Sequence, residues 1–263
     1  MSRLSTFAIT FATLALLALG CQPSEVRVTP IRVSDNGGGM TSTIDLAEVQ
    51  DWVDDVNDTW LWDFQVHPAG LHDISSTTLN TAPDTDAKWQ AYDNTAHWAV
   101  ATTFLGNGLP VFFRARNSVG FSGGPTVRHY VSMPSWDNAN GNATLLSHEI
   151  GHYFGLAHTH ADDLACTELS STKADGDANG QRNDVTWDDI DDTPADPGED
   201  CVTNTPPTCN VNATAIIGGV TYSPPWTNLM SYHDCVPETM SGGQLGVVGK
   251  VSQDGMRGYV FQD

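Results

Sequence analysis

Between residues 45 and 60, hydrophobic side chains recur at steps of three and four, which is the spacing of one helix face. The positions are Leu46, Val49, Trp52, Val53, Val56 and Trp60. We therefore predict an amphipathic helix that begins at Asp45 and buries this stripe against a core. The two tryptophans are interpreted as core anchors rather than as a platform for a cofactor.

Other segments carry shorter patterns that predict further helices and strands. The predicted helices cover residues 86–104 and 142–154, and a glycine-containing helix lies within 239–260. The predicted strands cover residues 26–33, 64–71, 109–113 and 127–133. A turn is expected at Gly37–Gly39 and a loop at residues 120–125.

The composition is that of a folded and strongly acidic protein. A chain of 263 residues with 40% hydrophobic residues and eight tryptophans can bury a substantial core, and we favour one domain with two lobes. The formal net charge of −21 repels phosphate backbones, so a nucleic-acid partner is excluded.

The first twenty residues combine Arg3 with an apolar run that is too short to span a membrane comfortably, which is typical of an export signal. The segment Leu17–Cys21 is compatible with a bacterial lipoprotein signal, and Ala18 with Gly20 is compatible with ordinary cleavage. Lipidation of Cys21 leaves four of the five cysteines, an even number suited to two disulfides in an oxidising compartment. We therefore expect an exported protein that is anchored at a bacterial cell envelope by lipid alone, or otherwise secreted.

The segment His148–His158 has the spacing of a hydrolytic zinc site. On a helix, His148 and His152 share one face and can present two ring nitrogens to one metal ion, while Glu149 reaches a water bound there. Gly155 allows the chain to leave the helix, so that His158 returns as the third ligand. Three protein ligands leave one tetrahedral position for water, and Glu149 is the predicted general base.

The remaining histidines are interpreted as surface or hydrogen-bonded core residues. They are His67, His72, His97, His129 and His233. His160 competes with His158 for the third ligand position, but the ten-residue step from His148 fits only His158. If Cys21 is not lipidated, its thiolate is a candidate for the open zinc position.

The zinc string resembles the extended signature of the metzincin metallopeptidases. Downstream, Asn228–Tyr232 resembles the Met-turn of that class, with Met230 as an apolar floor beneath the metal. The string through Thr159, the stretch Asp191–Pro194 and the cysteine after the Met-turn are most similar to the pappalysin family. This resemblance covers roughly residues 140 to 240.

The resemblance implies an α+β, zincin-like fold with a twisted mixed sheet. It divides the chain into a signal peptide, a linker with the first strand, an upper lobe with the zinc helix, and an irregular, disulfide-stapled lower lobe. The corresponding residues are 1–20, 21–42, 43–158 and 159–263. In such an architecture the edge strand of the sheet, here expected at 127–133, lines the cleft for a protein or peptide substrate.

Two further features are implied by the pappalysin resemblance. The disulfides are expected to pair Cys166 with Cys209 and Cys201 with Cys235. The alternative for these cysteines is a second zinc site, which no Cys-x-x-Cys spacing supports. Tyr232 is expected to donate a hydrogen bond to the developing oxyanion or to act as a movable extra ligand.

The acidic segment 162–200 is a candidate calcium site. Asp175, Asp177 and Asn179 follow the spacing of the first half of a calcium loop, but Thr186 stands where an EF-hand has its bidentate glutamate. Candidates to complete a different site are Asp184, Asp188, Asp189, Asp191 and Asp192. Pappalysins bind structural calcium in this lobe, and the alternative is a merely solvated acidic loop.

The predicted function is a zinc-dependent endopeptidase that hydrolyses proteins outside the cytoplasm by Glu149-assisted attack of zinc-bound water. The alternative is a catalytically silent, lipid-anchored protein with a calcium-binding or adhesive role on the same fold. The intact Glu149 argues against that alternative. A metzincin of another family is a second alternative, which the Asp-Thr-Pro stretch and the cysteine layout disfavour.

Overall fold

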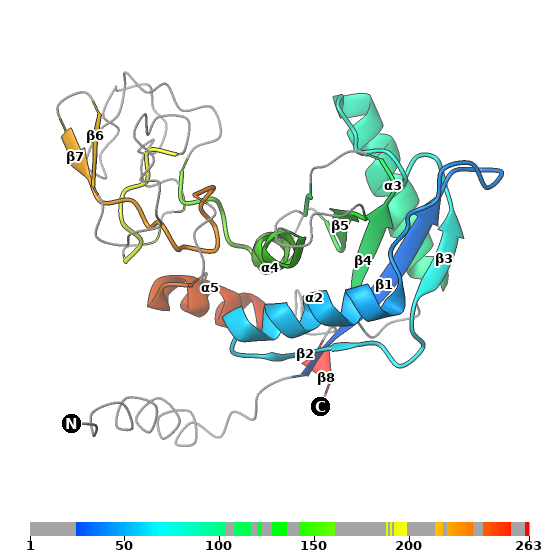
Figure 1. The fold of residues 1–263 in the computed structure, drawn as a ribbon, viewed down its shortest axis with the longest axis horizontal. Helices are drawn as coiled ribbons and strands as arrows, with labels where there is room; N and C mark the ends of the chain where they lie inside the picture. The colour runs from blue at the N-terminus through cyan, green and yellow to red at the C-terminus, as the bar shows by residue number, and fades with distance from the viewer. Residues whose placement is uncertain are drawn as a thin grey trace.

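The computed structural model describes residues 25–103, 108–116, 120–122, 128–135, 142–160, 188, 190, 192–198, 214–217, 220–233, 239–253 and 261–262. The elements in chain order are β1 (Glu25–Ser34), α2 (Leu46–Thr59), β2 (Asp63–Val66), β3 (His72–Ser75), α3 (Asp86–Thr103), β4 (Leu109–Arg114), β5 (Val131–Pro134), α4 (Asn142–Tyr153), β6 (Ala215–Ile217), β7 (Val220–Tyr222), α5 (Gly242–Gln253) and β8 (Phe261–Gln262). Figure 1 shows their arrangement.

A mixed sheet in the order β2-β1-β4-β5 organises the fold. Strands β2, β3 and β4 run parallel to β1, and β5 runs parallel to β4. The short strand β8 pairs antiparallel with the start of β1. The described residues therefore form a mixed α/β fold whose main sheet is parallel except for β8, which confirms the predicted mixed sheet with helices but not a segregated α+β arrangement.

The strand predicted at 64–71 is wrong in its extent. The chain forms two strands instead, and both pair with β1. Strand β2 pairs with residues 25–28 of β1, and strand β3 pairs with residues 31–34 of β1. Between them Pro68 lacks a backbone N–H for a ladder, and Gly70 takes a positive φ of 73°. The chain therefore turns here before it rejoins the same edge of β1.

The strand predicted at 127–133 is also wrong in its extent, because β5 begins only at Val131. The side chains of Arg128 and Tyr130 both donate to Asp93 on α3, which holds the residues before β5 against that helix. Phe121 pairs antiparallel with Ser132 through two backbone hydrogen bonds of 2.9 Å. The segment 120–122, predicted as loop, therefore covers the outer edge of β5 at this point.

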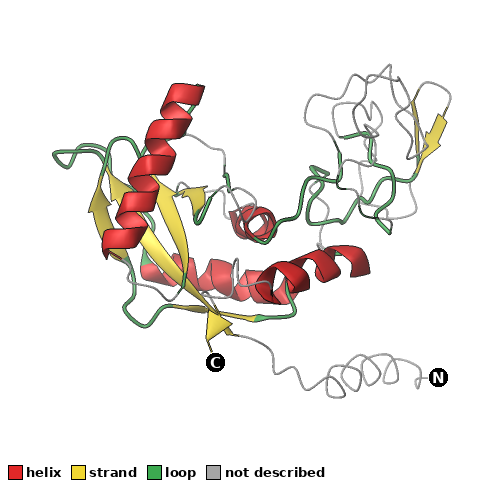
Figure 2. Ribbon diagram, turned by 180° about the vertical axis from the view of Figure 1, so that it is seen from behind, coloured by secondary structure: helices red, strands yellow, loops and turns green. Residues whose placement is uncertain are grey.

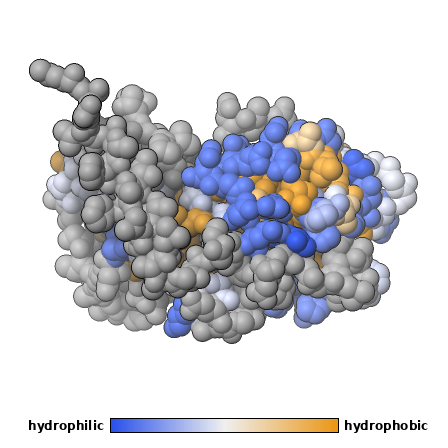
Figure 3. Space-filling model, turned by 90° about the horizontal axis from the view of Figure 1, so that it is seen from below, coloured by the Kyte–Doolittle hydropathy of each residue, from blue (hydrophilic) through white to orange (hydrophobic). Residues whose placement is uncertain are grey.

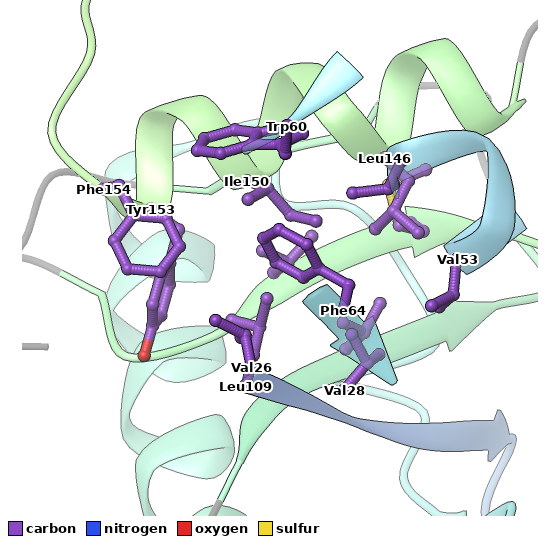
Figure 4. Packing of buried hydrophobic residues seen from close by; sticks show 14 of the residues in the cluster. Val26, Val28, Val53, Trp60, Phe64, Leu109, Leu146, Ile150, Tyr153 and Phe154 are labelled. Carbon is purple, nitrogen blue, oxygen red and sulfur yellow. The ribbon is translucent and has the colours of Figure 1, made fainter. Parts of the chain in front are cut away.

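The sheet separates two apolar cores because side chains alternate along its strands. In β1, Val26 and Val28 belong to the core with α2 and α4, whereas Ile31 and Val33 belong to the core with α3. Figures 1 and 2 show α2 on one face of the sheet and α3 on the other. Figure 4 shows the first core, where Trp60 and Phe64 meet Ile150 of α4 between the helices and the strands.

Helix α2 begins where the sequence predicts. Asp45 is its N-cap, and its carboxylate accepts from Glu48 N while the Glu48 carboxylate accepts from Asp45 N. Val49, Val53 and Val56 are buried as predicted. Leu46 is an exception, since the first turn extends past the core and leaves this side chain 45% exposed.

The C-terminal third contributes a hairpin, β6–β7, that the sequence analysis did not predict, and α5, which confirms the predicted helix in a shorter form. Figure 1 shows the hairpin on the far side of α4 from the sheet. Within the described part of the chain, no helix is long and apolar enough to cross a membrane. Figure 3 shows a largely hydrophilic described surface on the side viewed there, with limited apolar areas.

Several predictions fall outside the described residues. They concern the signal peptide, Cys21, the four other cysteines, and the calcium candidates Asp175, Asp177, Asn179, Asp184, Asp189 and Asp191. The lipid anchor, the disulfides and the division into two lobes therefore stay predictions.

Candidate active site

Helix α4 carries the first half of the candidate site. Leu146, Ile150 and Tyr153 are fully buried in the first core and fix the orientation of the helix. Trp60 adds a hydrogen bond from its indole N–H to Ser147 Oγ at 2.9 Å. This packing leaves His148 and His152 on the other side of the helix, while Glu149 lies beside Gly120 near the edge of β5.

The end of α4 brings the third histidine into the site. Gly155 adopts a φ of 94°, and Leu156 N donates to Gly151 O while Gly155 N donates to His152 O, each at 2.9 Å. The chain reverses at this left-handed residue. His152 Nε2 and His158 Nε2 consequently lie 2.9 Å apart.

The three predicted ligands converge on one point. His148, His152 and His158 each offer a ring nitrogen, and these atoms all lie within 4.8 Å of one another. Backbone carbonyls hold two of the rings, since His148 Nδ1 lies 2.6 Å from Leu229 O and His152 Nδ1 lies 2.8 Å from Leu156 O. Because a carbonyl only accepts, the hydrogen sits on Nδ1, and Nε2 keeps its lone pair for a metal.

The protonation state of the cluster also suits a metal. Burial, followed by the neighbouring His152 and His158, lowers the pKa of His148 to about 3, so this ring is neutral at ordinary pH. Neutral imidazole is the form that binds zinc. Three imidazole nitrogens so close together are the donor set that a zinc ion prefers, so these residues fit a metal ion.

Glu149 lies beside the histidine cluster and is only 4% exposed. Burial raises its pKa to about 8, against the opposing effects of the Arg114 guanidinium and the Ser122 backbone amide. Its Oε2 has no hydrogen-bond partner among the described residues. A buried carboxylate in this position is another mark of a cation site, because a bound cation favours its ionised form.

The predicted Met-turn lies under the helix. Met230 is fully buried, and a Cβ on Gly151 would collide with its Sδ, so this glycine allows the sulfur to approach between the two ligand positions of α4. Asn228 Oδ1 accepts from Met230 N at 2.9 Å. The amides of Asn228 and Gln244 also form a reciprocal pair at 2.9 and 3.0 Å, which ties the turn to α5.

Tyr232 reaches the site from the Met-turn, as predicted. Its hydroxyl lies 3.0 Å from His158 Nε2, and its ring centroid lies 4.6 Å from that of His158. The side chain is 40% exposed, so one side of it faces solvent. The phenol is therefore placed between the third histidine and the opening of the site.

Several residues around the site were not predicted from the sequence. Arg114 is fully buried and donates to Ser132 Oγ at 2.7 Å, and nothing in the local sequence marks it as a neighbour of Glu149. His160 and His233 are buried beside Asp196. The nearest signal for Asp196 is its place two residues after the Asp-Thr-Pro stretch.

Two calcium candidates are described. Asp192 accepts from Ser241 Oγ at 2.7 Å and from Gly243 N at 2.8 Å, so its carboxylate holds the beginning of α5. Asp188 Oδ1 accepts from Ile190 N at 3.1 Å. Neither contact tests a calcium ion, and calcium binding stays a prediction.

Comparison with protein families decides the class of this site. A model described as metallo-peptidase family M12, of the reprolysin type, matches residues 48–183, just over half of the chain. The chain belongs to metallopeptidase family M12. A second model, described as pregnancy-associated plasma protein-A, matches residues 126–248 and so covers the Met-turn as well. The predicted metzincin recognition is confirmed, and zinc is the metal that this class implies for the three histidines.

Solved structures show the same fold for this metallopeptidase. Mature mirolysin from Tannerella forsythia, in complex with a cleaved peptide, aligns with a TM-score of 0.59 at 15% identity over 91% of this chain and 96% of mirolysin. Mirolysin in complex with a small compound aligns with a TM-score of 0.56 at 16% identity, over 90% and 96% of the two chains. A search of curated protein sequences gives no match.

Proposed function

We propose that this metallopeptidase is a zinc-dependent endopeptidase of the pappalysin type, which hydrolyses proteins outside the cytoplasm. The observation that carries the proposal is the convergence of three imidazoles beside a buried carboxylate. The ring nitrogens of His148, His152 and His158 lie within 4.8 Å of one another, and Glu149 Oε2 has no partner in the described part of the chain. This is the arrangement that hydrolysis by a metal and a general base requires.

The residues divide the chemistry between them. When zinc is bound by His148, His152 and His158, it supplies a Lewis acid that acidifies water and polarises the scissile carbonyl. Glu149 takes a proton from the attacking water on Oε2 and returns it to the leaving amine. The buried position of Glu149 favours both transfers, because little bulk water competes for the carboxylate.

Tyr232 would stabilise the oxyanion. Its hydroxyl is 3.0 Å from His158 Nε2, so the phenol would leave that contact when His158 holds a metal ion. The freed O–H then donates to the oxyanion that develops as water adds to the carbonyl. The partial exposure of the ring gives it room for this movement.

An extended peptide fits the sheet edge beside this centre. The segment 120–122 pairs with β5 through Phe121 and Ser132, and a Cβ on Gly120 would lie only 2.9 Å from Glu149 Oε1. A peptide that adds itself alongside this segment would therefore pass close to the general base. The mirolysin complex with a cleaved peptide supports a peptide substrate through the shared fold.

The subtype and location complete the proposal. The pregnancy-associated plasma protein-A model includes the Met-turn, which supports the pappalysin type. Export followed by lipidation at Cys21, two disulfides and structural calcium rest on the sequence arguments given above. An extracytoplasmic location is compatible with all three.

The proposal is tested by digestion of a peptide library with the purified protein. We expect cleavage that is lost with a zinc chelator, restored by zinc and absent from Glu149→Ala, which keeps the metal ligands. Zinc content is measured on each sample to separate loss of metal from loss of the base. No cleavage by folded, zinc-loaded wild-type protein would contradict the proposal.

A further inference from the structure

We propose that Asp196 is a positioning residue, which fixes the third ligand His158 and Tyr232 relative to each other. The roles of these two residues rest on the function proposed above. Asp196 belongs to the described segment 192–198, which is distant from both in the sequence, and the side chain is fully buried. Its carboxylate lies between the chain that follows His158 and the chain that follows Tyr232.

The first set of contacts holds the chain after His158. The Thr159 hydroxyl donates to Asp196 Oδ2, and His160 Nδ1 lies 3.8 Å from the same oxygen, which is too long for a hydrogen bond. The His160 ring is stacked on His158, with centroids 5.4 Å apart and planes inclined by 8°. Asp196 therefore holds Thr159 by a hydrogen bond and lies against His160, the two residues that follow the third ligand.

The second set of contacts holds the chain after Tyr232. His233 Nε2 lies 2.9 Å from Asp196 Oδ1, and an ionised carboxylate only accepts, so this nitrogen carries the hydrogen. The His233 ring also packs on Trp226, with centroids 4.6 Å apart. Because His233 adjoins Tyr232 in the chain, its bond to Asp196 limits where the phenol can lie.

His160 links the two sets. Its ring lies 4.7 Å from the Tyr232 ring as well as against His158. Gly198 supports it from below, since a Cβ on this residue, whose φ is 73°, would lie 3.2 Å from His160 Cδ2. Gly198 N also donates to Asp196 Oδ1 at 2.9 Å. Asp196 and Gly198 thus both lie against His160, whose ring contacts His158 and Tyr232.

The carboxylate suits this position energetically. Burial alone raises the pKa of Asp196, but contacts with His160, His233 and Thr159 outweigh it and hold the pKa well below its usual range. The group is therefore ionised, and its hydrogen bonds are the strong, charge-assisted kind. An amide in its place keeps the shape but loses the charge and turns one acceptor into a donor.

The test compares Asp196→Asn with a matched control, Asp35→Asn. Asp35 is also a largely buried carboxylate that accepts hydrogen bonds, but from Arg116 and Asn80 near the end of β1. We expect Asp196→Asn to release its metal about 10- to 100-fold faster than wild type, as loss of a supporting contact behind a ligand typically does. The absorption spectrum of the cobalt-substituted protein should change with it, while Asp35→Asn matches wild type in both.

Kinetics give the second readout. We expect Asp196→Asn to lower kcat while KM stays within about threefold, because His158 and Tyr232 act mainly in the transition state. If the wild type has no peptidase activity, the proposed endopeptidase function is wrong. Metal release and the cobalt spectrum still test the positioning role of Asp196 in that case. Wild-type metal release, spectrum and kcat in folded Asp196→Asn would overturn the proposal, and so would the same changes in Asp35→Asn.

A milder variant decides the matter if Asp196→Asn does not fold. Thr159→Val keeps the shape of the side chain and removes only its hydrogen bond to Asp196. We expect faster metal release in the same direction as for Asp196→Asn, but smaller. A folded Thr159→Val with wild-type metal release and spectrum would overturn the proposal in that case.

Discussion

The two halves of the active site are held in place by different kinds of interaction. We call His148, Glu149 and His152 the helix arm, and His158 with Tyr232 the turn arm. The helix arm stands on one face of α4, whose other face packs through Leu146, Ile150 and Tyr153 into an apolar core. Leu229 and Met230, next to Tyr232, belong to the same core, but the segments of the turn arm are joined to one another by the buried polar contacts of Asp196, Asn228 and Gln244. Apolar packing therefore mainly stabilises the helix arm, whereas buried polar contacts mainly orient the side chains of the turn arm.

Two contacts join the arms, since His148 Nδ1 pairs with Leu229 O and Gly151 admits the Met230 sulfur. Within the turn arm, Thr159 N donates to Met230 O at 3.1 Å. The Met-turn takes part in all of these contacts. It therefore transmits any displacement of the turn arm to the ligands of the helix arm.

The largest expected effect comes from removing one ligand from each arm. We expect His152→Ala and His158→Ala to bind zinc at least about 100-fold more weakly than wild type, because losing a direct ligand costs more than losing a supporting contact. Competition with a coloured chelator measures the affinity. The control is His97→Ala, since His97 is exposed on α3. A wild-type affinity in His158→Ala would show that the turn arm supplies no ligand.

Ile150→Ala tests the apolar support of the helix arm. This side chain is fully buried in the first core, so its truncation should lower the free energy of unfolding by about 2–5 kcal/mol. Urea unfolding measures that loss, and kcat is corrected for the folded fraction. We expect the corrected kcat to stay close to wild type, the reverse of the result for Asp196→Asn. A large fall in corrected kcat would remove the distinction between the arms.

Gly151→Ala tests the contact between α4 and the Met-turn. The added methyl group meets Met230 Sδ, and such overpacking should lower the free energy of unfolding by about 1–3 kcal/mol despite the better helix propensity of alanine. Gly246→Ala in α5 is the control, because nothing lies within 4 Å of its added Cβ. In Gly246→Ala only the better helix propensity of alanine acts, so the free energy of unfolding should rise by about 1 kcal/mol. Equal effects at both glycines would contradict a tight approach of the sulfur.

The smallest expected effect concerns acid stability in the sheet region, far from either arm in the contact network. Hydrogen bonds from Arg116 and Asn80 lower the pKa of Asp35 to about 2. Its stabilisation is therefore present above the unfolded pKa of about 4 and is lost as the pH falls toward the folded pKa. Urea midpoints between pH 6 and pH 2.5 should show Asp35→Asn below wild type at pH 6, with the gap narrowing on acidification. A constant gap would contradict the assigned cause.

The helix arm was predictable because its signals are local. The spacing of His148, Glu149 and His152 on one helix turn, and Gly155 after it, depends only on helix geometry and on the left-handed conformation of glycine. The same holds for α2, whose hydrophobic period and Asp45 cap lie within one segment. Periodic segments of this length leave little room for tertiary contacts to change the outcome.

The turn arm was predictable only through family resemblance, and only in part. Met230 and Tyr232 were found from the Met-turn pattern, but Asp196, Gln244 and Arg114 were not, because each acts on a residue far away in the chain. The predicted bounds of the short strands were wrong for a similar reason. Tertiary contacts of Arg128 and Tyr130 with Asp93 decide where β5 begins, and no local pattern records them.

The bond between His148 and Leu229 also bears on how the site is assembled. The two residues are 81 positions apart, so the carbonyl that orients the His148 ring is made long after the ring itself. A nascent chain that ends shortly after α4 already contains the three histidines and Glu149, but not the carbonyl that orients the first of them. Correct geometry of the histidine cluster therefore depends on a segment that is synthesised much later than the helix that carries its first two members.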